Sequence, residues 1–185
     1  TDVNKGKEFA LSFNCKYYNK LEDLLDSNCE TVIIAVINCF VKDIILLALK
    51  YNKNILVEKP MGKNYEESLE IYKKSTESDK IIKVGFNHRY HPAILKAKHL
   101  FDSGEIGDLI FIRSKYGHGG RLGMEKEWRA SKYLCGGGEL LDQGSHLIDL
   151  VRWFAGEIDS VFGRVSTKFW NMEVEDNTFI LLKSI

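Results

Sequence analysis

The chain has 185 residues, 44% of them hydrophobic and 28% charged, and its 26 basic and 26 acidic side chains give a formal net charge of zero. This composition is ordinary for a soluble globular protein. The balanced charge gives no attraction to nucleic acid, and no apolar run approaches the roughly 20 residues of a membrane-spanning helix, so we expect neither kind of partner.

The cysteines and histidines give no sign of a structural metal or a disulfide. Four cysteines are scattered along the chain without Cys-x-x-Cys spacing, and no signal-like segment is present in the sequence. This pattern favours a reducing compartment, so we expect a cytoplasmic protein with free thiols, no disulfide and no zinc. His88 and His91 are spaced for a metal, but no carboxylate or cysteine nearby completes a site, so we expect no metal.

The first half of the chain alternates short β-branched runs with segments of helical spacing. Strands are predicted over residues 15–18, 31–37, 54–58 and 80–85. Helices are predicted over residues 5–13, 20–26, 41–51 and 64–78. Strands that are apolar on both faces and joined by helices indicate βαβ units. The fold class predicted for this half is α/β with a doubly wound parallel sheet.

The pattern changes after Phe86. A helix is predicted over residues 92–102, a strand over 109–116, an irregular stretch over 117–138, a helix over 139–155, and strands over 158–169 and 174–182. Several strands with few helices indicate an α+β domain with an open, mostly antiparallel sheet. We therefore predict two domains, residues 1–86 and residues 87–185.

Polar side chains directly follow two of the predicted parallel strands. Lys59 and Pro60 follow one strand, and Asn87 and Arg89 follow the next. Ligands of open α/β sheets bind outside the carboxyl ends of the strands, so these side chains are expected to face one crevice. The alternative is that Lys59 is merely a solvated loop lysine. The rigid Pro60 beside it makes this alternative weaker. Asp2 lies where an earlier strand would end, and a carboxylate there can accept hydrogen bonds from an adenosine ribose.

The helix that follows three consecutive glycines carries Asp142, His146 and Asp149 on one face, because four and three residues separate them. Apolar residues cover much of the remaining surface, and a buried Asp or His costs stability unless it is paired or used. A satisfied core histidine is the alternative for His146. Asp149 has Arg152 three residues further on as a possible partner, and we leave it outside the catalytic set. Asp142 and His146, together with Lys59, predict a proton-handling site.

The stretch over residues 117–138 is too long and too glycine-rich for a simple connection, and loops of this length are usually functional or disordered. It carries Trp128, Arg129 and further cations suited to an anionic or sugar-like ligand. The alternative is a surface loop of mixed charge, because Glu125 and Glu127 lie among the cations.

Five segments resemble one known family in order along the chain. They are Val32–Ala35, Ile55–Met61, Val84–Tyr90, Gly136–Asp149 and Val174–Asn177. The Glu-Lys-Pro motif paired with Asp-x-x-x-His closely resembles the Gfo/Idh/MocA oxidoreductases, the family of glucose-fructose oxidoreductase and inositol dehydrogenase. One loop departs from the family pattern: Val36, Ile37 and Val41 stand where relatives often have Thr-Pro and a histidine.

The resemblance implies a partial Rossmann domain that binds NAD or NADP, followed by a domain whose open sheet holds the substrate and forms a homodimer or homotetramer. It places Asp2 at the ribose-binding position, where a carboxylate repels a 2′-phosphate, so NAD is favoured over NADP. Implied cofactor contacts are Asp2, Val36, Asn38, Glu58, Lys59 and Asn87. The chain begins without Met and ends in an apolar run, so we expect a longer polypeptide with the glycine-rich phosphate loop before Thr1.

The resemblance also implies hydride transfer between the nicotinamide and a hydroxyl or keto carbon of a sugar, cyclitol or nucleotide sugar. His146 would take the hydroxyl proton, Lys59 would hydrogen-bond the reacting oxygen, and Asp142 would orient the substrate or the imidazole. Implied substrate contacts are Arg89, Trp128 and Arg129. Two alternatives remain open: a non-catalytic dinucleotide-binding regulatory protein of the same fold, and an NAD-dependent glycosidase.

Overall fold

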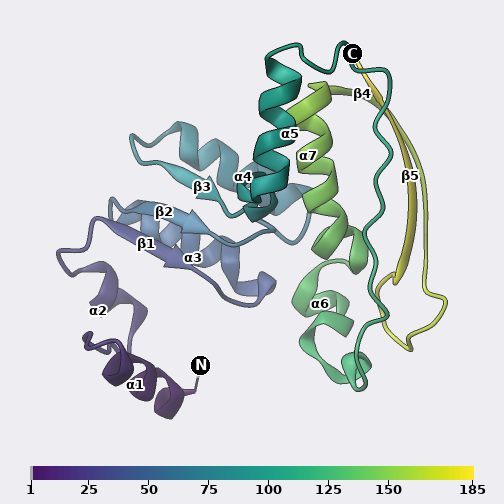
Figure 1. The fold of residues 1–185 in the computed structure, drawn as a ribbon. Coiled ribbons are helices and arrows are strands. Elements are labelled where there is room, and N and C mark those ends of the chain that lie inside the picture. Colours follow the sequence, from purple (N-terminus) through teal and green to yellow (C-terminus); the bar gives the residue numbers. More distant parts are fainter. Residues whose placement is uncertain (1) are drawn as a thin grey trace.

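A computed structural model describes residues 2–185 and contains two sheets with helices between them (Figure 1). The first sheet is parallel, with strand order β1 (Thr31–Ile34), β2 (Asn54–Val57) and β3 (Ile82–Val84). Helices α3 (Asn38–Lys50) and α4 (Tyr65–Thr76) make the two crossovers. The predicted α/β class with a parallel sheet is confirmed.

The core of this half lies between one face of the sheet and the two crossover helices. Alternate strand residues point into it, and α3 supplies the residues at helical spacing that cover them. Its buried members are Leu25, Val32, Ile34, Val41, Ile45, Ala48, Leu49, Ile55, Val57 and Ile71. The opposite face of the sheet exposes Ile33 and Leu56. In the described residues the strands are therefore buried on one face, not on both as the sequence predicts.

Two helices precede the sheet, α1 (Val3–Ser12) and α2 (Leu21–Leu25). Asp2 caps α1, because its carboxylate accepts the N–H groups of Asn4 and Lys5 at 3.0 and 3.2 Å. Its predicted ribose contact stays a prediction. The strand predicted over residues 15–18 is wrong for residues 2–185: this segment is irregular, and the sheet within this range begins at β1 and offers it no partner.

In the second half, β3 leads into the short 3₁₀ helix η1 (Asn87–Tyr90) and helix α5 (Pro92–Asp102). Helix α7 (Ser145–Ala155) lies beside α5 (Figure 1), with the rings of Phe101 and Phe154 5.7 Å apart. The antiparallel strands β4 (Ile158–Ser166) and β5 (Asn177–Ser184) form the second sheet. None of the helices in residues 2–185 has the length and apolar character needed to cross a bilayer.

Three details of the second half differ from the sequence prediction. The strand predicted over residues 109–116 is wrong for residues 2–185: this segment pairs with neither β4 nor β5, and Ile110 and Phe111 are exposed. The stretch over residues 117–138 contains η2 (Met124–Lys126), η3 (Trp128–Ala130) and α6 (Lys132–Cys135). The helix predicted over residues 139–155 starts with a π-helical turn, η4 (Leu140–Gly144).

The β4–β5 sheet exposes large apolar side chains on one face. Phe162 lies opposite Leu181, and Phe179 is the next exposed residue along this face. The homodimer or homotetramer expected through this sheet stays a prediction.

Candidate functional site

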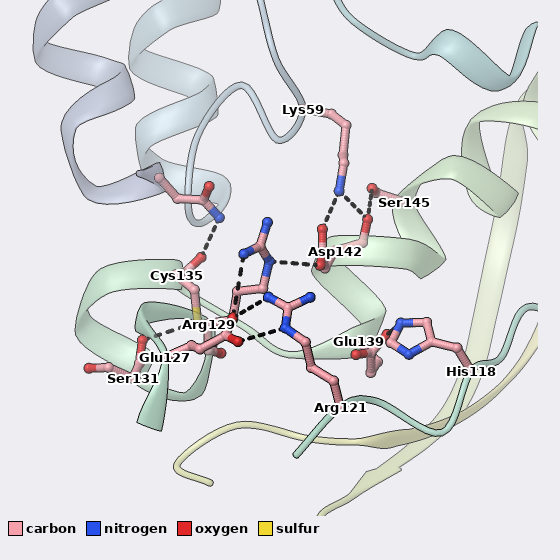
Figure 2. A network of polar contacts seen from close by, with 11 residues as sticks. Lys59, His118, Arg121, Glu127, Arg129, Ser131, Cys135, Glu139, Asp142 and Ser145 are labelled. Carbon is pink, nitrogen blue, oxygen red and sulfur yellow. Dashed lines mark hydrogen bonds and ion pairs between the residues drawn. The ribbon is translucent and has the colours of Figure 1, made fainter. Parts of the chain in front are cut away.

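An ion pair between Lys59 and Asp142 joins the two halves of the chain (Figure 2). Lys59 Nζ donates to a carboxylate oxygen of Asp142 and, at 2.5 Å, to the main-chain oxygen of the same residue. The lysine side chain is only 12% exposed. Because two hydrogen bonds fix its direction, the alternative of a solvated loop lysine is wrong.

Strand β2 delivers Lys59 to this position. Val57 is fully buried in the sheet, and the N–H of Glu58 donates to the Ile34 oxygen at 2.9 Å, which extends the parallel pairing by one residue. The Lys59–Pro60 peptide bond is cis, and Pro60 is buried. Lys59 thus leaves the sheet at its carboxyl edge, where open α/β sheets bind their ligands.

Glycines let the start of η4 approach two other segments closely. A Cβ on Gly136 would lie 2.2 Å from the Lys63 oxygen, and the φ angle of +87° also favours glycine here. A Cβ on Gly138 would lie 1.9 Å from the main-chain oxygen of Glu175. The Glu175 carboxylate accepts the N–H groups of Gly138 and Leu140 at 3.0 and 3.1 Å. These contacts fix the turn that carries Asp142.

A chain of charges ends on the second oxygen of Asp142 (Figure 2). Arg129 Nε lies 3.6 Å from Asp142 Oδ2, and Arg129 also lies 3.8 Å from the Glu127 carboxylate. Arg121 binds Glu127 through two hydrogen bonds of 2.7 and 2.5 Å. This loop therefore has the mixed charge that the alternative describes, but one of its cations, Arg129, also lies beside Asp142.

A small cavity, open to solvent, lies next to Asp142. Its lining combines apolar and polar side chains, as small-molecule sites do. The lining includes Met124, Trp128, Arg129, Glu139, Asp142 and Met172. Burial raises the pKa of Glu139, although His118, whose Nε2 lies 3.7 Å from that carboxylate, acts in the opposite direction.

His146 is buried in α7, with 6% of its surface exposed. Its ring stacks on that of His88 at 3.9 Å, and its Nδ1 has no hydrogen-bond partner in the described part of the chain. Burial, followed by the nearby His88 and Lys59, lowers the pKa of His146 to about 4. The ring is therefore neutral near pH 7 but a weaker base than an exposed histidine, and its unpartnered Nδ1 argues against the alternative of a satisfied core histidine.

The pKa of His146 predicts how stability depends on pH. A histidine in the unfolded chain titrates near pH 6.5, so between pH 6.5 and about 4 the unfolded state binds a proton that the folded state does not. The free energy of unfolding should fall by up to about 3 kcal/mol as pH falls through this window, and this contribution should stay constant above it. Urea unfolding of wild type and His146→Phe at several pH values measures the difference. Parallel curves for the two proteins would contradict the assignment.

The predicted pairing of Asp149 with Arg152 is wrong. Asp149 accepts two hydrogen bonds from Arg89, at 2.7 and 2.6 Å, while Arg152 binds Glu157. The partner of Asp149 lies 60 residues away in sequence, in η1, and the Arg89 guanidinium also lies 5.4 Å from the Trp153 ring. Arg89 thus holds η1 on α7, and its predicted substrate contact stays a prediction.

The other predicted cofactor contacts lie along the carboxyl edge of the parallel sheet. Val36 follows β1, Glu58 follows β2 and Asn87 opens η1, and all three are exposed. The Asn38 amide donates to the main-chain oxygen of Cys135 at 2.8 Å and so ties α3 to α6.

A nicotinamide dinucleotide fits these residues. Exposed polar groups line the carboxyl edge of the sheet, and the buried Nδ1 of His146 lacks a partner in residues 2–185, as expected where a bound group completes the site. A parallel sheet with a lysine, a carboxylate and a neutral imidazole beside its carboxyl edge is the arrangement expected of a dinucleotide-binding protein of the Rossmann type.

Comparison with known proteins agrees with this class. Residues 1–86 match the oxidoreductase family with an NAD-binding Rossmann fold, and residues 94–184 match the GFO/IDH/MocA C-terminal domain. The chain belongs to the GFO/IDH/MocA oxidoreductase family.

Curated relatives include several dehydrogenases. The chain is 31% identical to levoglucosan dehydrogenase of Pseudarthrobacter phenanthrenivorans over 77% of this chain and 37% of that protein. It is also 31% identical to mouse trans-1,2-dihydrobenzene-1,2-diol dehydrogenase and to glucose-6-phosphate 3-dehydrogenase of Bacillus subtilis, over 98% of this chain in both cases, and 54% and 53% of those proteins. The chain thus spans about half the length of these two relatives and less of the first.

Solved structures show the same fold. Levoglucosan dehydrogenase in complex with NADH superposes with a TM-score of 0.87 at 25% identity, over 98% of this chain and 52% of that one. The WlbA dehydrogenase of Bordetella pertussis, in complex with NADH and UDP-GlcNAcA, superposes with a TM-score of 0.84 at 19% identity, over 99% of this chain and 54% of that one.

Proposed function

We propose that this chain carries the catalytic site of an NAD-dependent oxidoreductase that acts on a hydroxyl or keto carbon of a sugar, cyclitol or nucleotide sugar. The observation that carries the proposal is the Lys59–Asp142 ion pair beside the buried, neutral His146. This trio comes from the carboxyl edge of the parallel sheet and from two consecutive turns of the second half. The relatives named as dehydrogenases of levoglucosan and glucose 6-phosphate support this substrate class.

In the proposed reaction the alcohol carbon loses a hydride and its hydroxyl group loses a proton. Bound NAD supplies the acceptor for the hydride. His146 accepts the hydroxyl proton on a ring that is neutral near pH 7, although a pKa of about 4 makes it a weaker base than an exposed histidine. Lys59 donates a hydrogen bond to the reacting oxygen and stabilises the negative charge that develops there, while Asp142 keeps the ammonium in place.

The remaining assignments follow from position. Trp128 and Arg129 line the cavity next to Asp142 and would contact the substrate. Val36, Glu58 and Asn87 would contact the cofactor, and Asp2 would bind its ribose and favour NAD over NADP. We also propose that residues 1–86 form the cofactor domain and residues 87–185 the start of the substrate domain.

The test is reduction of NAD⁺ by the protein at its natural length. The panel should hold neutral sugars, inositols, sugar phosphates and nucleotide sugars, with NADP⁺ run in parallel. We expect NADH to form with at least one member, and faster than NADPH. Tight NAD binding without turnover on any member would contradict the proposal and indicate a regulatory protein. Release of free sugar from a glycoside without net NADH would indicate a glycosidase.

A further inference from the structure

His146 lies at the end of a stack of three rings. The His88 ring is nearly parallel to those of Tyr116 and His146, with centroid distances of 5.7 and 3.9 Å and interplanar angles of 19° and 15°. Phe86 meets His146 edge-on, at 6.1 Å and 83°. One face of the His146 ring is thus covered by a second imidazole.

Nδ1 of His146 makes no hydrogen bond within the described residues that would hold this ring in place. A catalytic histidine usually donates one ring N–H to a carboxylate or a carbonyl, which fixes the ring and its tautomer. Nδ1 of His146 is buried and has no hydrogen-bond partner among residues 2–185. Within the described chain the orientation of this ring therefore depends on packing against its aromatic neighbours.

The element that carries His88 is anchored to the helix that carries His146. Arg89, the next residue, makes two hydrogen bonds to Asp149, which lies three residues after His146 on the same face of α7. Two consecutive residues of η1, His88 and Arg89, therefore contact His146 and Asp149 of α7. One of these contacts is an ion pair with a carboxylate that is 9% exposed, and the other is the stacked pair of imidazoles.

We propose that His88 is a positioning residue whose imidazole fixes the ring plane of His146. The catalytic half of this proposal rests on the proposed function, whereas the structural half does not. His88 stacks on the imidazole and, within residues 2–185, makes no hydrogen bond or ion pair with Lys59 or Asp142, so it acts through His146 rather than on the reacting atoms.

The charges around His146 support this role. His88 and Lys59 disfavour a positive charge on the ring, while Asp142 and Asp149 favour one, and Asp149 is already paired with Arg89. Two stacked imidazoles 3.9 Å apart cannot both be protonated without strong repulsion. The stack also excludes water from one face of His146, and burial is the largest of the effects that keep it neutral.

Two variants separate the stacking from the charge. His88→Phe keeps a flat ring against His146 but removes a titratable group, whereas His88→Ala removes both. The exposed His91→Ala serves as the control. The probe is the titration of ¹³C-labelled histidine by NMR in the protein at its natural length, with the His146 signal assigned from a His146→Asn variant.

We expect the pKa of His146 to rise in both variants, and further in His88→Ala, where water also reaches the ring. With the substrate and NAD⁺, His88→Ala should lower kcat on the order of 10-fold with little change in KM, because a displaced catalytic group slows the reaction more than it weakens binding. His88→Phe should recover most of the kcat that His88→Ala loses. His91→Ala removes a ring nitrogen that caps α5 but should leave kcat and the His146 titration as in wild type.

Folded His88→Ala protein with an unchanged His146 titration would overturn the proposal, as would a His88→Phe variant no better than His88→Ala in kcat. The NMR result does not depend on turnover. If the protein reduces no cofactor but the titration shifts as expected, the proposed function fails while the structural role of His88 stands.

Discussion

Replacing Lys59 with Met should slow NAD⁺ reduction by a factor on the order of 10² to 10⁴. Methionine keeps much of the length of the side chain but cannot donate a hydrogen bond to the reacting oxygen or pass on its proton. Folding should survive, because Asp142 retains Arg129 at 3.6 Å as a second cation. Steady-state kinetics with the best substrate of the panel measures the loss, which we expect in kcat more than in KM.

Lys63→Met is the matched control for this variant. Lys63 lies four residues further along the same loop, and its ammonium pairs with Glu67 at 3.6 Å instead of with the site. It should keep close to wild-type turnover. Equal losses in the two variants, or a folded Lys59→Met protein with undiminished kcat, would exclude Lys59 from the chemistry.

Replacing Gly138 with Ala should have the largest effect on the fold of the site. The added Cβ would lie 1.9 Å from the Glu175 main-chain oxygen, and backbone on both sides leaves little room to adjust. We expect a loss of about 3 kcal/mol in the free energy of unfolding, the upper part of the range for overpacking. Turnover should fall as well, since η4 carries Asp142. Urea unfolding and kinetics measure the two effects.

Gly119→Ala is the comparison for this variant, because a Cβ at position 119 meets nothing within 4 Å. It should change the free energy of unfolding by well under 1 kcal/mol, as open surface substitutions usually do. Similar stabilities for the two variants would show that the close approach of Gly138 to Glu175 does not constrain the turn.

Local patterns predict the elements of this fold well where the elements are stabilised locally. The helix predicted over residues 92–102 matches α5, because a proline at its first position and regular apolar spacing define it. The strand predicted over residues 109–116 fails for the opposite reason. Its apolar character satisfies strand propensity, but a strand also needs a neighbour to pair with, and in the described residues this segment pairs with neither β4 nor β5.

The same distinction holds for the site. The spacing of Asp142 and His146 places both on one face of a helix, and the strand end places Lys59 at the edge of the sheet, so the trio follows from the sequence. The partner of Asp149 does not follow from the sequence. Spacing along a helix reveals only the local Arg152, whereas Arg89 binds Asp149 from another element.

The supporting contacts of the site were missed for a related reason. His88 draws attention in the sequence only as half of a metal-like pair, and its stack on His146 depends on the packing of η1 against α7. Glu175 belongs to a motif that the sequence shows. Its hydrogen bonds to Gly138 and Leu140 form only because the connection between β4 and β5, which carries Glu175, packs against the start of η4.

The transfer of a deuterium label tests the central claim most directly. The best substrate of the panel, deuterated at its hydroxyl-bearing carbons, is incubated with NAD⁺ and the protein at its natural length, and the NADH formed is analysed by mass spectrometry. A dehydrogenase with this site should yield NADH that carries one deuterium from the substrate carbon, while the hydroxyl proton goes to water. NADH without the label, or label lost to water with no NADH formed, would contradict direct hydride transfer at this site.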